Sequence, residues 1–291
     1  MTGTPGTPLV SIVTPSFNQG QFIEDTIRSI AAQDYPRIEH IVCDGGSNDD
    51  TVAILERYKR AGRLTYTSGR DGGQAAAINS GFARARGDIV TWLNSDDVYV
   101  FTDTVSAMVH AFAAHPEADF VYGDFLEIDA ENEVQRVLLR PGHFSRERLL
   151  RIGYISQPAT FFRRSVIERF QLDPALRIAL DLDFFLRASG AGMRFRHLRR
   201  IVAAERLHDA AKCVAEGPRL QVEARAVREK YGHRFDWKHH LLRTADRVYL
   251  AAYGLLGLLP WMHQRPLAVR LHRPPLLRHW LYQLRLQRSP S

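Results

Sequence analysis

One stretch of the sequence runs Thr91-Trp92-Leu93-Asn94-Ser95-Asp96-Asp97, directly after the apolar pair Ile89-Val90. Its β-prone first half predicts a buried strand, and its second half places an amide, a hydroxyl and two carboxylates at the carboxyl end of that strand. Open α/β sheets bind ligands at this end. Two adjacent carboxylates repel each other unless a divalent cation lies between them and a phosphate-bearing ligand. The alternative is that Asp96 or Asp97 caps the next helix, and this stretch alone leaves both readings open.

The chain before this stretch alternates apolar strands with helices. Strands are predicted at residues 9–15, 38–44, 64–68 and 89–93, and helices at 21–33, 51–60 and 75–86. Ser47 with Asp50 fits a capping box at the start of the second helix. Gly81 weakens the third helix without breaking it. The alternation indicates a mostly parallel sheet with helices on both faces.

The pattern changes after residue 97. A helix at 104–115 and a strand at 119–124 lead into a hairpin at 127–140 with its turn at 129–132, which predicts mixed pairing. A strand follows at 159–162, and the last strand of the domain is predicted at 201–204. Asp181 and Asp183 lie in the first turn of another helix, where the helix dipole favours anions.

Three strands of the first half end in polar groups, in residues 15–18, 44–47 and 94–97. Because the carboxyl ends of parallel strands share one edge of a sheet, groups remote in sequence converge on a single crevice there. This convergence favours a binding site over an isolated acidic turn.

The composition is that of a globular protein, with 291 residues, 45% hydrophobic and 24% charged. The net charge of +7 is concentrated in the last part of the chain, because six arginines and no acidic residue follow His263. Two cysteines, Cys43 and Cys213, indicate neither a disulfide framework nor a zinc cluster, and favour a reducing compartment. No nucleic-acid-binding module accompanies the positive charge, so nucleic acid is not an expected partner.

The two ends of the chain are expected to differ in character. Residues 1–8 are polar, are predicted to be disordered and lack the features of a secretion signal. The apolar run 248–262 is shorter than the roughly 20 residues of a spanning helix. We therefore expect a cytoplasmic protein, with the cytoplasmic face of the membrane as a candidate location.

The ordered motifs resemble those of the family 2 glycosyltransferases, an inverting group with a GT-A fold. The matching segments are residues 13–18, 33–36, 42–49, 77–81, 87–89, 93–97, 157–162 and 181–183. The resemblance implies a GT-A fold, an α/β architecture with a Rossmann-like central sheet of mixed, mostly parallel strands. It also implies a nucleoside-diphosphate sugar as donor and a hydroxyl of a glycan or lipid-linked molecule as acceptor.

By position in these motifs, the nucleotide contacts are expected at Pro15, Phe17, Asn18, Asp44, Gly45, Asp71, Asn94 and Ser95. Asp44 resembles the carboxylate that accepts a hydrogen bond from the base. A carboxylate suits a ring N–H such as that of uracil, which favours a UDP-linked donor. Arg70, beside Asp71, is a candidate for pairing with phosphate.

The resemblance places a divalent cation, Mg²⁺ or Mn²⁺, at Asp96, with Asp97 beside it and His208 as a late ligand. This sequence departs from the family pattern at Asn94, which stands where an aspartate is usual. The uncharged amide should weaken cation binding, so Asp96 is expected to carry most of it.

Asp181 resembles the catalytic base, with Gln157 and Asp183 assigned to the acceptor or diphosphate. Burial beside the acceptor raises the pKa of a carboxylate enough for it to act as a base. The usual acidic neighbour of the base is missing, because Leu180 stands there. Helix capping is the alternative for Asp181 and Asp183.

We expect a transferase domain at residues 9–212, with a nucleotide-binding half (9–100) and an acceptor-binding half (101–212). Residues 213–291 are expected to form a helical, basic and apolar extension. Contact with an anionic membrane is favoured for it, with packing on the domain or a homodimer contact as alternatives.

The leading hypothesis is a metal-dependent glycosyltransferase that builds a cell-envelope glycan. A sugar nucleotidyltransferase would carry a glycine-rich, basic loop after the first strand, and residues 15–18 contain none. Asn94 and Leu180 prompt the other alternative, a catalytically inactive scaffold that binds nucleotide or glycan.

Overall fold

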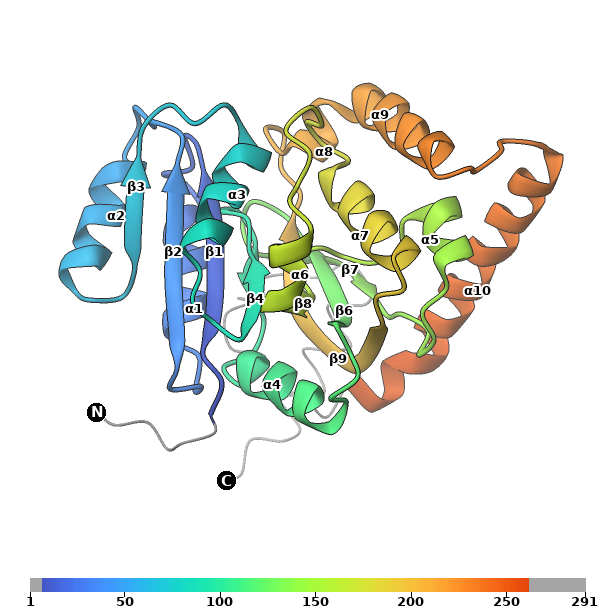
Figure 1. Ribbon diagram of the computed structural model, residues 1–291, viewed down its shortest axis with the longest axis horizontal. Helices are drawn as coiled ribbons and strands as arrows, with labels where there is room; N and C mark the ends of the chain where they lie inside the picture. Colours follow the sequence, from blue (N-terminus) through green and yellow to red (C-terminus); the bar gives the residue numbers. More distant parts are fainter. Residues whose placement is uncertain (1–6, 262–291) are drawn as a thin grey trace.

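The computed structural model describes residues 7–261. A curved, mixed sheet runs through the molecule in the order β3-β2-β1-β4-β8-β6-β9-β5, with β7 paired to β6 (Figure 1). The strands are β1 (Val10–Ser16), β2 (Ile38–Asp44), β3 (Thr65–Ser68), β4 (Ile89–Trp92), β5 (Val98–Tyr99), β6 (Phe120–Ile128), β7 (Val134–Leu138), β8 (Thr160–Arg163) and β9 (Phe195–Arg206). The helices are α1 (Ile23–Ala31), α2 (Thr51–Arg60), α3 (Gln74–Arg84), α4 (Thr104–Ala114), α5 (Arg146–Ile152), α6 (Arg164–Arg169), α7 (Leu180–Gly190), α8 (Lys212–Ala215), α9 (Gly217–Lys230) and α10 (Trp237–Trp261).

The first half of the sheet is parallel, as predicted. β1 pairs with β2 and β4, and all seven of its residues are buried. A strand covered on both faces reads as a nearly continuous apolar run, and residues 9–13 follow this pattern except at Ser11. In the register, Ser16 lies opposite Asp44, and Asp44 lies opposite Ser68. The carboxyl ends of β1, β2 and β3 therefore meet at one edge.

The second half of the sheet is mixed. β8 pairs antiparallel with both β4 and β6, whereas β6 pairs parallel with β9. The predicted hairpin is present as β6 and β7, and Asn132, with φ of 67°, occupies its turn. The last strand, β9, is longer than the predicted residues 201–204 because its first part pairs with β6 through residues of mixed polarity.

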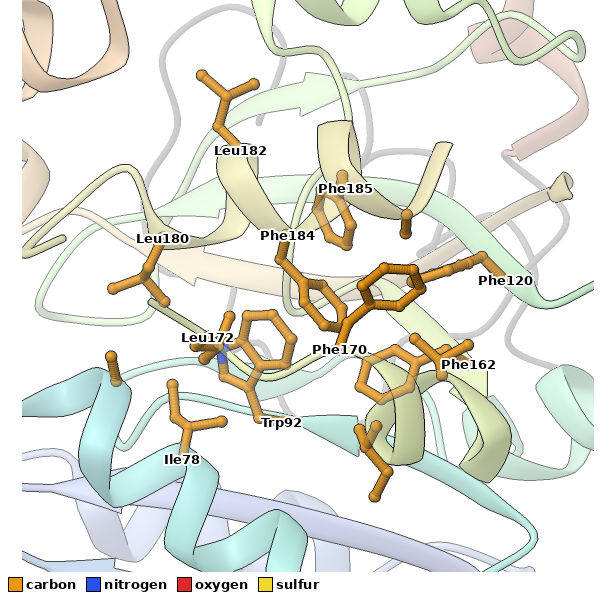
Figure 2. Packing of buried hydrophobic residues seen from close by; sticks show 14 of the residues in the cluster. Ile78, Trp92, Phe120, Phe162, Phe170, Leu172, Leu180, Leu182, Phe184 and Phe185 are labelled. Carbon is orange, nitrogen blue, oxygen red and sulfur yellow. The ribbon is translucent and has the colours of Figure 1, made fainter. Parts of the chain in front are cut away.

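Helices cover both faces of the sheet. α3, α5, α6, α7 and α9 pack on one face around a cluster of aromatic side chains, in which Trp92, Phe120, Phe162 and Phe184 lie together (Figure 2). α1, α2 and α4 cover the other face. Gly81 permits the close approach of α3 to β1, since a Cβ there would lie 2.2 Å from Cγ1 of Val13. This contact explains why a glycine stands inside a helix that continues past it.

The predicted capping box at α2 is wrong. Asp50 precedes the helix but makes no side-chain capping hydrogen bond. Ser47 instead turns towards the end of β2, where its hydroxyl donates to Asp44 and accepts from the backbone N–H of Asn18. The start of α2 is held by Asp49, whose carboxylate accepts from the N–H of Thr51 at 3.0 Å.

α9 and α10 follow the predicted domain boundary at residue 212. Ala224 and Val227 of α9 belong to the main core cluster. α10 is held to α5 by Asp246, which pairs with Arg148 at 3.0 Å and Arg151 at 2.6 Å. Among residues 7–261, no helix is both long and apolar enough to span a membrane. The segment predicted to be disordered lies largely outside the described residues, as does the arginine-rich end of the chain beyond residue 261.

Candidate active site

A cleft of about 830 Å³ opens at the carboxyl ends of β1, β2 and β4. Ten of the residues predicted for the site line it: Pro15, Phe17, Gly45, Asp71, Asn94, Ser95, Asp96, Asp97, Gln157 and Asp181. They come from the two halves of the chain, so the predicted convergence on one crevice is what the fold produces. Asn18, Asp44, Asp183 and His208 do not line the cleft walls.

Phe17, Gly45 and Asp71 form the end of the cleft nearest β2. The Phe17 ring is 60% exposed. A Cβ at residue 45 would lie 3.1 Å from Oδ2 of Asp71 and 3.3 Å from the Phe17 ring, so a larger residue would press on both side chains. Asp71 is fixed by the backbone N–H of Gly73, which donates to its Oδ1 at 2.8 Å. An exposed aromatic face beside a fixed carboxylate is suited to a nucleoside.

Asp44 lies beneath this wall rather than on it. It is 3% exposed, and its carboxylate accepts from the N–H groups of Gly46 and Ser47 and from the Ser68 hydroxyl at 2.6 Å. Asn18 is likewise used within the loops, since its Oδ1 accepts from the N–H of Asn48 at 3.0 Å. The structure therefore gives both residues a role in shaping the loops, and Asp71 is the carboxylate that lines the cleft at this end.

Asn94 is the centre of a hydrogen-bond network on the cleft floor. Its Nδ2 donates to Oδ2 of Asp97 at 3.0 Å and to Oε1 of Gln157 at 3.2 Å. Its Oδ1 accepts from Nε2 of Gln74. The side-chain oxygen of Gln74, Oε1, in turn accepts from Nζ of Lys212 at 2.7 Å. An aspartate at this position could not donate to either acceptor. The network gives a physical reason for an amide here.

Asp97 is directed into the protein. Besides the bond from Asn94, its Oδ1 accepts from the backbone N–H of Arg206 at 3.0 Å. Burial, with the nearby charges of Asp96 and Glu205, holds the pKa of Asp97 well above its ordinary value. The Arg206 guanidinium donates to the backbone carbonyl of Asp96 at 2.8 Å and fixes the acidic turn against α1 and the β6–β7 hairpin.

Asp96 and His208 meet at the edge of the cleft. Nε2 of His208 lies 3.3 Å from Oδ2 of Asp96, and its ring packs on Phe22 with the centroids 4.4 Å apart. Across the described part of the chain, no three His, Cys, Asp or Glu side chains are grouped so as to hold a metal ion. One carboxylate and one imidazole still fit Mg²⁺ or Mn²⁺, because these ions take their remaining ligands from water and substrate phosphates.

Asp181 occupies the first turn of α7 and lines the cleft. Burial raises its pKa to about 6, although the N–H of Leu182 donates to its Oδ1 at 2.7 Å and favours the charged form. A carboxylate with a pKa near 6 is suited to accept a proton close to neutral pH.

Asp183 does not reach the cleft. Two residues along a helix turn a side chain through roughly 200°, so Asp181 and Asp183 cannot face the same side. The Asp183 carboxylate is buried between α7 and α9, where it accepts from Lys230 and Tyr231 and pairs with Arg187 at 3.1 Å. Its assignment to the acceptor or diphosphate is therefore corrected to a link between two helices.

Glu205, near the end of β9, is a cleft residue that the sequence interpretation missed. Its Oε1 accepts from the Ser156 hydroxyl at 2.6 Å. Burial raises its pKa to about 7, and the nearby charge of Asp181 adds to the shift. A signal was present, because Glu205 directly follows the apolar run 201–204, just as Asp44 follows an earlier strand.

Lys212 is a second missed residue. It lies in the cleft at the start of α8, and burial lowers its pKa. Arg70 also lines the cleft, whereas Arg177 is paired with Glu216 at 2.7 Å. Lys212 and Arg70 thus bring positive charge to the same space as the acidic turn, which suits a diphosphate bound together with a cation.

The sequence profile named glycosyl transferase family 2 matches residues 11–170, more than half of the chain. The chain belongs to this family. The match contains Phe17, Gly45 and Asp71, the acidic turn and Gln157, and it ends before Asp181. An uncharacterised glycosyltransferase of Mycobacterium tuberculosis is 36% identical over 187 residues, which cover 62% of this chain and 69% of the relative.

Two solved structures share the fold of this family 2 chain. S. aureus TarS, residues 1–349 in complex with UDP, superposes with a TM-score of 0.58 at 22% identity, over 69% of this chain and 61% of that one. The mannosyltransferase PcManGT of Pyrobaculum calidifontis, in complex with GDP-Man and Mn²⁺, gives 0.60 at 19% identity, over 97% and 81% of the two chains. The GT-A fold predicted from the motifs is thereby confirmed.

Proposed function

We propose that the protein is an inverting glycosyltransferase. It moves a sugar from a nucleoside diphosphate to a hydroxyl of a glycan or lipid-linked acceptor, with Asp181 as the base. The observation that carries this proposal is that Asp181, whose burial raises its pKa to about 6, lines the same cleft as Asp96 and the Phe17–Asp71 wall. Such a transfer needs a base, groups that bind the diphosphate with its cation, and a wall that receives the nucleoside.

Different residues along the cleft bind the nucleoside, the diphosphate with its cation, and the acceptor. Phe17 and Asp71 receive the nucleoside, and Lys212 with Arg70 pairs with the diphosphate. Asp96 and His208 would hold Mg²⁺ or Mn²⁺, which when bound neutralises charge that develops on the leaving diphosphate. Asp181 orients the acceptor hydroxyl and takes its proton as the oxygen attacks the anomeric carbon. The carboxyl of Glu205, with a pKa of about 7, is a second group near Asp181 that can hold a proton at neutral pH.

Removal of the base tests the proposal. Asp181→Asn should lower sugar transfer by about 10²- to 10⁴-fold, the usual contribution of a general base, while donor binding persists. Transfer is measured with radiolabelled donor, with and without Mn²⁺. Asp50→Asn, at an exposed position before α2, is the matched control and should leave transfer unchanged. Equal turnover in both variants would remove Asp181 from the mechanism. If the wild-type protein binds nucleotide but transfers no sugar, the inactive scaffold is favoured.

For the donor, we favour a uridine nucleotide. TarS in complex with UDP supports this choice, whereas PcManGT binds GDP-Man on the same fold. Thermal unfolding of this chain with UDP or GDP and Mn²⁺ decides between them, because at equal ligand concentration the nucleotide with the lower Kd stabilises the folded state more. We expect a larger rise in Tm with UDP, and a larger rise with GDP would reverse the choice.

We further propose that residues 9–212 form the transferase domain and that α10 rests on an anionic membrane surface. Trp237, Leu241 and Val248 lie on one outward face of α10, and each is more than 60% exposed. Lys238 and Arg247 are exposed beside them. An apolar stripe flanked by basic residues is the pattern of interfacial helices. Such a contact would bring the cleft close to a lipid-linked acceptor.

A further inference from the structure

A second, smaller cavity adjoins the proposed base. It has a volume of about 280 Å³ and is lined by residues of α5, α7 and α9. Figure 1 shows these three helices on the same side of the molecule. Asp181 lines both this cavity and the large cleft, whereas the other residues of the cavity are separate from the cleft walls. A group bound here would therefore lie next to Asp181 but away from the nucleoside wall.

The wall of this cavity is apolar. Its main side chains are Leu149, Ile152, Ile155, Leu182, Phe185 and Leu220. Besides Asp181, the polar side chains of the lining are Gln221 and Arg228. A pyranose ring carries a hydroxyl on most of its carbons and would leave several of them without partners here. The chemistry favours a hydrocarbon group over a sugar ring.

Arg228 makes the cavity polar at one side. Its guanidinium lies beside Gly153, where a Cβ would be 3.3 Å from Nη2. Within the described residues, Nε of Arg228 has no hydrogen-bond partner. Its charge acts on Asp181 and favours the ionised carboxylate. The cavity thus combines an apolar wall with a cation that faces the base.

We propose that this cavity binds the apolar part of the acceptor, an alkyl or aryl group carried next to the hydroxyl-bearing sugar that meets Asp181. The inference rests on the proposed function, since it takes Asp181 as the base. The volume lies just below the range for ligand pockets, on the order of 300 to 1,000 Å³. It therefore admits the first carbons of a lipid or a single ring, and the rest of a longer chain extends beyond it.

The test compares acceptor analogues that differ only in their apolar group. Methyl and hexyl β-glycosides of glucose, galactose, mannose and N-acetylglucosamine are titrated into the full chain by calorimetry, in the presence of Mn²⁺ and UDP. The hexyl glycoside of the accepted sugar should bind at least tenfold tighter than its methyl counterpart, since each buried methylene adds to affinity. Equal affinity of the two would overturn the proposal.

Two pairs of variants on α9 locate the binding site. Ala224→Phe fills the cavity and Leu220→Ser makes its wall polar, and both should abolish the hexyl preference. Ala226→Phe and Val222→Ser are the controls, because both positions are exposed on the same helix, and they should retain it. Circular dichroism and thermal unfolding confirm that each variant is folded. A preference that survives in folded Ala224→Phe or Leu220→Ser, or that disappears equally in the controls, contradicts the proposal.

The outcome is distinguishable from a failure of the proposed function. If Asp181→Asn transfers sugar at the wild-type rate, the base assignment falls whatever the hexyl preference is. If Asp181→Asn is inactive and the hexyl preference is absent, the transferase mechanism stands and the cavity loses its assigned ligand.

Discussion

Asn94 illustrates how one side chain is fixed by the donors and acceptors around it. Oδ2 of Asp97 and Oε1 of Gln157 both accept from its Nδ2, so the position needs a donor. The departure from an aspartate at this point of the family motif is therefore compensated by the fold. It also leaves Asp96 as the carboxylate that remains for a cation, because both oxygens of Asp97 accept hydrogen bonds from the protein.

Asn94→Asp should destabilise the protein, because it removes the two hydrogen bonds that Nδ2 of Asn94 donates to Asp97 and Gln157. Leaving buried acceptors unpaired costs about 1 to 3 kcal/mol, which corresponds to a fall in Tm of roughly 2 to 10 °C for a domain of this size. Differential scanning calorimetry at pH 7.5 measures the change. Asn48→Asp, at an exposed loop position, is the control. An unchanged Tm in Asn94→Asp would mean that the amide is not needed on the cleft floor.

The pKa of Asp181 predicts how transfer depends on pH. A base works only when it is deprotonated, and the pKa of this carboxyl is about 6. The transfer rate at saturating donor should therefore fall about tenfold for each unit as the pH drops below 6, and level off above about 7. Asp181→Glu, which keeps the carboxylate but shifts its position, should be slower with a displaced pH midpoint. A wild-type rate that is constant from pH 5 to 8 would contradict this role.

At the scale of elements, α10 joins the transferase to its surroundings. Its inner face is anchored to α5 by Asp246, with Arg148 and Arg151. Its outer face exposes Trp237 and Val248 to solvent. An element that is fixed on one side and apolar on the other is suited to carry the domain on a surface.

Membrane contact through α10 predicts a measurable loss on substitution. Replacement of Trp237, Leu241 and Val248 by serine should lower the fraction that floats with phosphatidylglycerol vesicles by about tenfold, since each residue loses buried apolar area. Val222→Ser, at an exposed apolar position on α9, is the control and should float like the wild type. Equal flotation of the triple variant and the wild type would exclude this face of α10 as the membrane contact.

Across the whole molecule, the features that could be predicted were those that depend on short, continuous stretches of sequence. The parallel strands and the acidic turn follow from apolar runs that end in polar groups, and residues 15–17, 45 and 94–97 reach one cleft because parallel strands share an edge. The partners of a side chain are set by non-local packing, and here the sequence was less informative. Asp44 is enclosed by donors from its own loop and from Ser68 of β3, and Asp183 by groups on α9.

Two carboxyls of the cleft, those of Asp181 and Glu205, have pKa values that burial raises. These shifts predict how the stability of the whole molecule depends on pH. In the unfolded chain Glu205 and Asp181 titrate near 4.5 and 3.8, whereas in the folded protein their pKa values are about 7 and 6. Between about pH 4 and pH 7 the folded state therefore binds more protons than the unfolded state, so stability decreases as the pH rises through this window.

Glu205→Gln removes one of these groups and keeps a side chain of the same size beside Ser156. The variant should show a smaller fall in Tm between pH 5 and pH 8 than the wild type, and a higher Tm than the wild type at pH 8. Thermal unfolding followed by circular dichroism at half-unit steps of pH measures both curves, with Glu131→Gln in the exposed β6–β7 turn as the control. Parallel curves for Glu205→Gln and the wild type would show that the fold does not raise the pKa of Glu205, and that the second proton-holding carboxyl of the cleft must be sought elsewhere.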